Sequence, residues 1–297
     1  MRAMAVKFSI KDLERLSGVK AHTLRIWEQR YELLHPRRTS TNIRYYNNED
    51  LKKILNVSLL NNHGHKISSI AGLSEENLSK EAGKLLQAYE KESDQIEHLM
   101  FALLDWDEAR FEETVRKAIT HFGLENTIEK IVFPFLRQLG NMWQVGIVSP
   151  AQEHFISNLI RQKIIVEIDK LGAGNTAGDK LALLFLPNNE LHEMGLLYAY
   201  YLCRKKGMRC LYLGQSTPYN DLLSVYNVAK PDILITILTS CFNAEETVDF
   251  LNKAKVAFAK SKVYISGRLI VGENAPAYSF PQNIKTFKEF NDFKAMI

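Results

Sequence analysis

Short apolar runs alternate with amphipathic stretches from residue 181 to the C-terminus, and this alternation limits the fold more than any other feature of the chain. Strands that alternate with helices at this spacing predict a parallel sheet with helical crossovers. We therefore predict a flavodoxin-like, doubly wound sheet, which binds ligands at the carboxyl ends of its strands. The predicted strands are Leu181–Leu186, Arg209–Leu213, Ile233–Ile237 and Val263–Ile265, and the predicted helices are Leu191–Lys206, Tyr219–Val228 and Ala244–Ala259.

A histidine follows the first predicted strand at the end where a ligand would bind. Glu190 precedes His192 by two residues, and Gly195 follows it by three. A carboxylate so placed can bind one imidazole nitrogen, which fixes the tautomer and raises the basicity of the other nitrogen. The pattern therefore indicates a metal-ligating histidine. Zinc is a poor candidate, because the sequence has neither cysteine pairs nor a cluster of three ligands.

Residues 93–171 show helical periodicity throughout, with apolar residues three and four positions apart. Pro134 and Gly140 interrupt this pattern, which favours a bundle of four helices over one long rod. Residues 172–178 are rich in glycine and small residues, and they are expected to form a flexible boundary before the sheet. Near the end of the helical stretch, Trp143 stands ten residues before a Glu153-His154 pair.

The two patterns together resemble the cobalamin-binding module shared by methionine synthase and the CarH/LitR-type light-responsive repressors. The resemblance covers about residues 90–297. It implies that His192 is the lower axial ligand to cobalt and that Glu190 is the hydrogen-bonded partner of this histidine. It also implies that Gly195 leaves space for the nucleotide tail of the cofactor. The expected cofactor is cobalamin, as adenosylcobalamin or methylcobalamin.

The same resemblance assigns the upper face of the corrin to the helical bundle. It implies that Trp143, Glu153 and His154 cap this face and contact the adenosyl group. Light-responsive members often carry a histidine directly after the tryptophan, but Gln144 stands there in this chain. A glutamine amide is a weak cobalt ligand, which argues against a bis-histidine photoproduct and leaves light sensing open.

Two further elements correspond to the part of the family module that surrounds the nucleotide tail. Thr236 and Leu238 match a Ser/Thr-x-Leu element after the third strand. Ser266 and Gly267 stand where a Gly-Gly pair is usual, so the tail is expected to be more tightly confined there.

The positive charge of the chain is concentrated at its N-terminus. Residues 1–66 carry thirteen Lys and Arg against six Asp and Glu, a net charge of +7, whereas the remaining residues carry 25 against 28, a net charge of −3. A capping-box pattern from Ser9 to Asp12 predicts the start of a helix that Gly18 ends. A second helix, Ala21–Tyr31, follows a tight turn, so the segment is expected to form a helix-turn-helix on a basic, nucleic-acid-binding domain.

A wing is expected after the second helix, because the basic turn at residues 36–42 leads into a short strand at Ile43–Tyr46. The order of these motifs over the first 73 residues resembles the winged-helix domain of the MerR family. The helix at Ala21 can enter a major groove with its first residues near base edges, while basic residues and a tyrosine hydroxyl contact phosphate. The predicted DNA contacts are His22, Thr23, Arg25, Arg30, Arg37, Arg38, Arg44 and Tyr45, whereas Trp27 and Tyr46 are assigned to the core.

The expected architecture is multidomain, α followed by α/β. It comprises a winged-helix domain (1–75), a helical linker (76–92), a four-helix-bundle cap (93–172) and a Rossmann-like cobalamin-binding domain (173–297). The sequence has no apolar run long enough to cross a membrane. Its three cysteines are odd in number and form no CxxC, so a cytoplasmic location is expected.

The favoured function is a cobalamin-dependent transcriptional repressor that binds a double-stranded DNA operator as a homo-oligomer, a dimer or a tetramer. One alternative keeps the DNA-binding domain but gives the degenerate module another ligand or a protein partner. A cobalamin enzyme is disfavoured, because no further domain remains for catalysis once the three domains are assigned.

Overall fold

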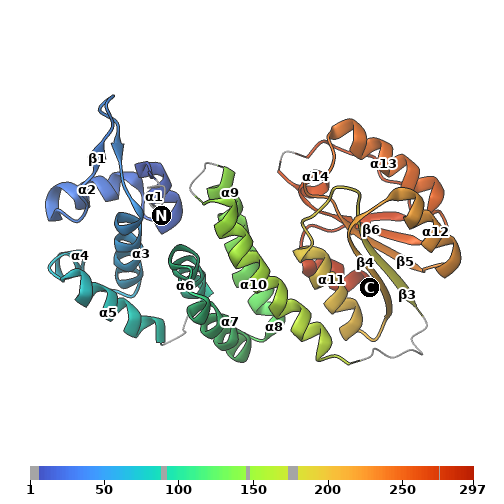
Figure 1. Ribbon diagram of the computed structural model, residues 1–297, viewed down its shortest axis with the longest axis horizontal. Coiled ribbons are helices and arrows are strands. Elements are labelled where there is room, and N and C mark those ends of the chain that lie inside the picture. The colour runs from blue at the N-terminus through green and yellow to red at the C-terminus, as the bar shows by residue number, and fades with distance from the viewer. Residues whose placement is uncertain (1–6, 88–91, 145–147, 173–179, 274) are drawn as a thin grey trace. The chain divides into compact units, whose positions relative to one another are not determined.

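The computed structural model describes residues 7–87, 92–144, 148–172, 180–273 and 275–297 (Figure 1). The chain forms two compact units, unit 1 from Met1 to Leu159 and unit 2 from Ile160 to Ile297. Unit 1 contains helices and a small hairpin, and unit 2 contains a parallel sheet flanked by helices. The expected division into four segments, at residues 75, 92 and 172, stays a prediction.

The first part of unit 1 is the expected winged helix-turn-helix. Ser9 caps the first helix through a capping box with Asp12, and Gly18, at a φ of 71°, ends it. Antiparallel pairing of two short strands forms the wing. Leu24 and Trp27 hold the second helix against the core, and Tyr46 is fully buried. The elements are α1 Ile10–Ser17, α2 Ala21–Tyr31, β1 Arg37–Arg38, β2 Arg44–Tyr45, α3 Asn48–Asn62, α4 Ile67–Ile70 and α5 Glu75–Gln87.

The remainder of unit 1 is the helical bundle. The breaks predicted at Pro134 and Gly140 are wrong, because both residues lie inside α9. A π-helical segment precedes Pro134: the Phe133 N–H donates to the Ile128 carbonyl five residues back, and such a widened turn tolerates a residue without an N–H. The elements are α6 Glu92–Asp105, α7 Glu108–Phe122, α8 Leu124–Asn126, the π-helix η1 Thr127–Val132, α9 Phe133–Gln144 and α10 Pro150–Asp169, which continues into unit 2 from Ile160.

Glu97 in α6 makes the stability of unit 1 depend on pH. Burial, together with the charge of Asp94, raises the pKa of Glu97 to about 8. The unfolded chain ionises this carboxyl near its ordinary pKa of 4.5, so the folded state is fully favoured below that pH and loses stability as the pH rises to 8. We expect Glu97→Gln to raise the free energy of unfolding at pH 8 by at least about 1 kcal/mol, and much less at pH 5. Urea unfolding at both pH values checks this, with exposed Glu108→Gln as the control; an equal gain at both pH values would contradict it.

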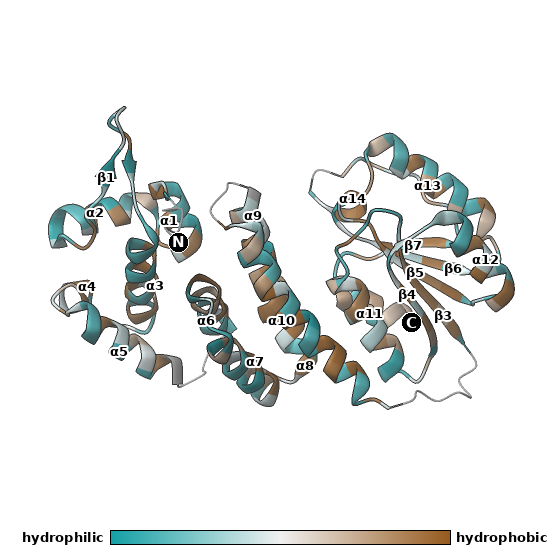
Figure 2. Cartoon of the chain, in the orientation of Figure 1, coloured by the Kyte–Doolittle hydropathy of each residue, from teal (hydrophilic) through white to brown (hydrophobic). Residues whose placement is uncertain are grey.

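The described part of unit 2 contains a five-stranded sheet in the order β4-β3-β5-β6-β7, with every pair parallel. This is the flavodoxin-like order, as predicted. Figure 2 shows its strands mostly in the hydrophobic colours, and the five residues of β5 are all buried on both faces. The strands are β3 Leu181–Pro187, β4 Arg209–Thr217, β5 Ile233–Ile237, β6 Lys262–Ser266 and β7 Ile284–Thr286.

Helices cover both faces of the sheet. Side chains of α12 and α13 form one core with alternate residues of β3, β5 and β6. On the other face, Tyr198 of α11 packs against Phe290 of α15, and Tyr264 of β6 packs against Phe293. The helices are α11 Met194–Lys205, α12 Tyr219–Ala229, α13 Ala244–Ala257, α14 Arg268–Val271 and α15 Phe290–Met296.

The sequence missed the C-terminal elements β7, α14 and α15, because each is too short to show a period. The expected flexible boundary at residues 172–178 lies outside the described residues, apart from Gly172. No helix within the described ranges has the length and apolar character needed to span a bilayer.

Candidate functional site

The predicted histidine lies at the mouth of the sheet, between the carboxyl ends of β3 and β5. These two strands are neighbours, and the chain leaves β3 on one side for β4 and later returns on the other side for β5. Such a switch point is where open α/β sheets bind ligands. Glu190 and His192 stand in the loop between β3 and α11, and the loop after β5 lies against them.

Glu190 is fully buried and accepts a series of hydrogen bonds. Its Oε2 atom accepts from the backbone N–H groups of Thr239 at 2.7 Å, Ser240 at 2.8 Å and Cys241 at 3.3 Å. Its Oε1 atom lies 3.1 Å from the backbone nitrogen of His192 and 2.7 Å from Nδ1 of the same residue. Consecutive N–H groups aimed at one oxygen form an anion-binding nest, here filled by a side chain of the protein itself.

The charge of Glu190 determines the tautomer of His192. Burial by itself would raise the pKa of Glu190, but hydrogen bonds from the His192 side chain and from the backbone of Ser240, Thr239 and His192 outweigh it and lower the pKa to about 2. An ionised carboxylate can only accept, so Nδ1 of His192 carries a proton. In the neutral ring, the lone pair then lies on Nε2, which is the nitrogen that a metal would take.

The His192 ring is accessible, since 60 % of its side chain is exposed. Cys241 is the other soft ligand type in the same loop cluster. Burial and the charge of Glu190 raise the pKa of this thiol to about 12, so the imidazole is the better ligand at neutral pH. In the described part of the chain, no group of three or more His, Cys, Asp and Glu side chains is arranged to hold a metal ion.

Several residues that sequence reasoning missed hold this loop. Gln215 donates to the Leu191 carbonyl at 2.7 Å, and the Ser216 N–H donates to the Glu190 carbonyl at 3.2 Å. The Ser240 hydroxyl lies 3.1 Å from Nδ1 of His192. Gln215 and Ser216 lie near the carboxyl end of β4, and Ser240 follows β5. The only sequence signal for them was their place near the carboxyl ends of predicted parallel strands, which share one edge of the sheet.

The predicted glycines are explained first by backbone packing. A Cβ on Gly195 would lie 2.7 Å from Cδ1 of Ile237, so its absence lets α11 approach β5. A Cβ on Gly267 would lie 2.3 Å from the carbonyl oxygen of Leu238, and Gly267 also has a φ of 103°. Their predicted roles beside the nucleotide tail stay predictions.

Thr236, Leu238 and Ser266 are all buried. Ser266 donates its hydroxyl to the Phe287 carbonyl at 2.6 Å, so this departure from the Gly-Gly pair joins β6 to the residue after β7. Thr236 differs, because its buried Oγ1 has no hydrogen-bond partner among the described residues. A buried hydroxyl without a partner is unfavourable unless a ligand or water supplies one, which fits a polar ligand group at this strand end.

The predicted upper-face residues belong to unit 1. Trp143 in α9 is about half exposed, which is unusual for a tryptophan of a helical bundle core. In α10, Nδ1 of His154 lies 2.7 Å from Oε2 of Glu153, so this pair repeats the carboxylate–imidazole contact of the sheet mouth. The side chain of Gln144 lies outside the described residues. Since these residues and His192 belong to different units, their common site stays a prediction.

The outward face of α2 carries the predicted major-groove residues. Leu24 and Trp27 mark its buried side, and His22, Arg25 and Arg30 are exposed on the rest of the helix. The hydroxyl of Thr23 lies 3.3 Å from Nε2 of His22. Ile26 and Gln29 are also exposed on this helix and are further candidates for contact with the major groove. The sequence analysis missed them, although helical periodicity counted from the buried Leu24 and Trp27 could have found them.

The wing presents the other predicted contacts. Arg37 pairs with Tyr45 and Arg38 with Arg44 across the hairpin, so four polar side chains gather on two short strands. Arg38 donates to Oδ1 of Asn42 at 2.8 Å, which orders the turn. Nε of Arg44 lies 3.5 Å from Glu28, whose other oxygen accepts from the Tyr46 hydroxyl at 2.9 Å. Arg44 is thus paired with a residue of α2.

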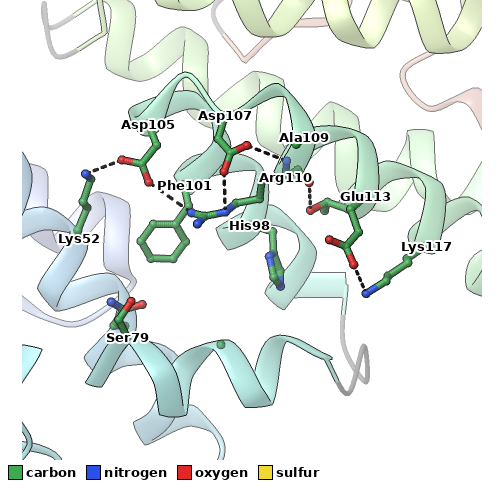
Figure 3. Close-up of a pocket in the computed structure, with 13 residues that line it drawn as sticks. Lys52, Ser79, His98, Phe101, Asp105, Asp107, Ala109, Arg110, Glu113 and Lys117 are labelled. Carbon is green, nitrogen blue, oxygen red and sulfur yellow. Dashed lines mark hydrogen bonds and ion pairs between the residues drawn. The ribbon is translucent and has the colours of Figure 1, made fainter. Parts of the chain in front are cut away.

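Unit 1 also contains a cavity of about 580 Å³ lined by α3, α5, α6 and α7 (Figure 3). Its charged groups pair with one another: Lys52 with Asp105 at 2.5 Å, and Arg110 with Asp105 at 3.3 Å and with Asp107 at 3.5 Å. Lys52 belongs to the winged-helix segment and the acids to the bundle, so ion pairs at this cavity connect the two parts of unit 1.

Comparisons with known proteins agree with this division of roles. Residues 8–77 match the model of the MerR HTH family regulatory proteins, and residues 95–166 match that of the B12 binding domain. The chain is 27 % identical over 267 residues to the HTH-type transcriptional repressor CarH of Myxococcus xanthus, covering 88 % of each protein. It is 28 % identical over 260 residues to the repressor CarA of the same organism, covering 87 % of this chain and 85 % of CarA.

A solved structure resembles the fold. The monomethylamine corrinoid protein of Methanosarcina barkeri superposes with a TM-score of 0.52 at 13 % identity, covering 69 % of this chain and 98 % of that one. The family resemblance inferred from the His192 and winged-helix motifs is confirmed. Residues 8–77 of the chain match the MerR-family helix-turn-helix regulators and residues 95–166 match the B12 binding domain, a combination that supports a MerR-family regulator with a cobalamin-binding module.

Proposed function

We propose that this protein is a DNA-binding transcriptional repressor whose state on the operator is set by bound cobalamin, with His192 as the lower axial ligand to cobalt. The observation that carries the proposal is the contact between Nδ1 of His192 and the buried carboxylate of Glu190, at 2.7 Å. It presents Nε2 as the metal-binding nitrogen on an exposed ring at the switch point of the sheet. Similarity to CarH and CarA supports the repressor role.

The residues present fit a cobalamin. His192 can supply one axial ligand, and Thr236 has a buried hydroxyl that lacks a partner among the described residues, at the strand end where a nucleotide tail is expected. Bound cobalamin would supply a cobalt ion that accepts the imidazole nitrogen and carries an adenosyl or methyl group. Trp143, Glu153 and His154 are the residues proposed to meet that upper ligand.

Cofactor binding can control DNA binding through linkage. A ligand stabilises the conformations that bind it, and it shifts an equilibrium only by its difference in affinity between the two states. A single winged helix makes few base contacts, so we propose that the protein binds its operator as a dimer or a tetramer. Cobalamin would then act by changing which assembly is populated.

Light sensing depends on the residue that follows Trp143. Gln144 stands where a histidine would be needed for a bis-histidine photoproduct, and its amide is a weak cobalt ligand. We expect illumination of the adenosylcobalamin-loaded protein to produce no bis-histidine absorption spectrum. If such a spectrum forms and His154→Ala removes it, His154 is the second cobalt ligand in place of a histidine at position 144. The protein would then be proposed to sense light.

The rival function, a degenerate module that binds another ligand or a protein, depends on the Ser266 and Gln144 departures. The hydroxyl of Ser266 is engaged with Phe287, so that departure has a role in the sheet itself. To separate the two functions, the purified protein is incubated in the dark with adenosylcobalamin or methylcobalamin, desalted and examined by visible absorption. Retained corrinoid, together with a change in oligomeric state or operator affinity, supports the proposal. A colourless protein after exposure to both forms refutes it.

Arg44 provides a test of the DNA-binding surface. If it contacts phosphate from the wing, Arg44→Ala will weaken binding to all duplexes and reduce the slope of log affinity against log salt by about one contact. Because Arg44 also pairs with Glu28, thermal unfolding must show that the domain remains folded. Fluorescence anisotropy at several salt concentrations measures the slope, with Arg15→Ala of α1 as the matched control. A slope equal to that of the native protein would remove Arg44 from the interface.

A further inference from the structure

The residue directly after the proposed cobalt ligand is a buried acid. The side chain of Glu193 is only 7 % exposed, although it stands at the N-terminus of α11 on the mouth of the sheet. A buried carboxylate is expensive unless it is paired and hydrogen-bonded. Two side chains from distant parts of the sequence satisfy it.

The first partner is Arg161 of α10, whose Nε donates to Oε1 of Glu193. Arg161 is 44 % exposed, so its guanidinium lies at the surface while the acid lies beneath it. The second partner is Tyr212 of β4, whose hydroxyl donates to Oε2 at 3.2 Å. Burial, together with the charge of Glu193, raises the pKa of Tyr212, so the phenol stays protonated and donates. Tyr212 is itself packed against Tyr200, with ring centroids 5.0 Å apart.

The contact with Arg161 joins the loop that contains His192 to α10, the helix that also carries the proposed upper-face residues. α10 runs from Pro150 to Asp169, so it begins in unit 1 and ends in unit 2. Its first half carries Glu153 and His154, and Arg161 follows them by about two helical turns. The same helix therefore bears the proposed upper-face pair and the arginine that binds the neighbour of the lower ligand.

We propose that Arg161, acting through Glu193, is a positioning residue: it holds the His192 loop in its ligating conformation and couples α10 to whatever His192 binds. The role at the metal rests on the proposed function, whereas the role in the loop does not. Loss of the guanidinium would leave Glu193 buried with only the Tyr212 hydroxyl as its described partner. The loop would then have to open to hydrate this charge, which moves the adjacent imidazole.

Hydrogen exchange on the protein without corrinoid tests the positioning role directly. We expect Arg161→Met to speed amide exchange at residues 188–193 by about tenfold, because opening of the loop becomes easier. Methionine keeps most of the aliphatic stem, so helix packing is retained. Lys170→Met is the matched control, since Lys170 pairs locally with Glu167. Arg161→Lys should restore most of the protection. Unchanged exchange in Arg161→Met overturns the proposal.

Reconstitution with methylcobalamin then tests the coupling. Visible spectra distinguish corrinoid with a nitrogen ligand below cobalt from corrinoid without one. We expect Arg161→Met to shift this equilibrium about tenfold towards the unligated form, near the lower end of effects seen when partners of metal ligands are replaced. The reversed pair, Arg161→Glu with Glu193→Arg, should recover part of the ligated form. An unchanged spectrum in Arg161→Met overturns the coupling.

A third measurement concerns α10 itself. In the native protein, methylcobalamin should slow exchange at residues 160–169, and this effect should be lost in Arg161→Met but kept in Lys170→Met. Equal slowing in all three proteins overturns the proposed coupling. If the native protein retains no corrinoid, the proposed function fails, and the exchange of the loop in the corrinoid-free variants still decides whether Arg161 positions His192.

Discussion

Replacing His192 with alanine is expected to lower the affinity for methylcobalamin by roughly a hundredfold or more, which corresponds to about 2.7 kcal/mol. The ring is exposed at the mouth of the sheet, and the ionised Glu190 holds its Nδ1 proton, so alanine removes the metal-binding nitrogen without disturbing a packed core. Retained absorbance after desalting and a spectral titration measure the loss. The variant should fold normally, because the backbone bonds from Thr239 and Ser240 to Glu190 remain.

A graded series makes this result specific. Glu190→Gln keeps the shape of the side chain but removes the charge that fixes the tautomer, so a smaller loss of about 10- to 100-fold is expected. His65→Ala, at an exposed histidine of the winged-helix segment, should leave corrinoid binding unchanged. Equal binding by His192→Ala and His65→Ala would exclude His192 as the ligand.

Gly267→Ala is expected to destabilise unit 2 by about 3 to 5 kcal/mol, or to prevent its folding. A methyl group there would lie 2.3 Å from the Leu238 carbonyl oxygen, which is backbone and cannot rotate away. The φ of 103° adds strain for any residue with a Cβ. Steric overlap and backbone strain together place the substitution among the most damaging class of point mutations.

Gly207→Ala is the matched control, since Gly207 has a φ of 77° but no atom within 4 Å of the position that an alanine methyl group would occupy. Only backbone strain applies there, so a loss of about 1 kcal/mol is expected. Urea unfolding monitored by circular dichroism compares the two variants. Similar losses at both glycines would show that the close approach to Leu238 relaxes easily, and would contradict the prediction.

The two predictions concern the same edge of the sheet for different reasons. His192 stands on a loop that the structure supports but does not need, whereas Gly267 lets the chain after β6 pass over the end of β5. Replacing His192 should reduce the corrinoid absorbance of the protein and leave its free energy of unfolding unchanged. Replacing Gly267 should lower the free energy of unfolding so far that corrinoid binding to the folded variant is difficult to measure. A site that combines an exposed ligand with a rigid frame is typical of binding sites carried on α/β sheets.

Capping motifs and hydrophobic periodicity correctly predicted α1, α2 and β5. The capping box at Ser9 and the left-handed Gly18 bound α1, and α2 spans the predicted residues Ala21–Tyr31. The run Ile233–Ile237 is the predicted strand. Prediction failed where a short element or a long-range contact decides the outcome. Pro134 does not break its helix, because the preceding π turn accommodates it.

Sequence by itself determined which residue types stand at the ends of which elements: a basic winged helix-turn-helix, a helical bundle, and a parallel sheet with Glu190 and His192 after its first strand. Spacing along one segment is enough for these conclusions, because helix and strand periods are local properties. Only the tertiary structure decided that three N–H groups after β5 hold Glu190 as an anion and that Arg161 reaches Glu193. These contacts join segments 32 to 51 residues apart, and such partners depend on strand order and helix packing, which no local pattern encodes.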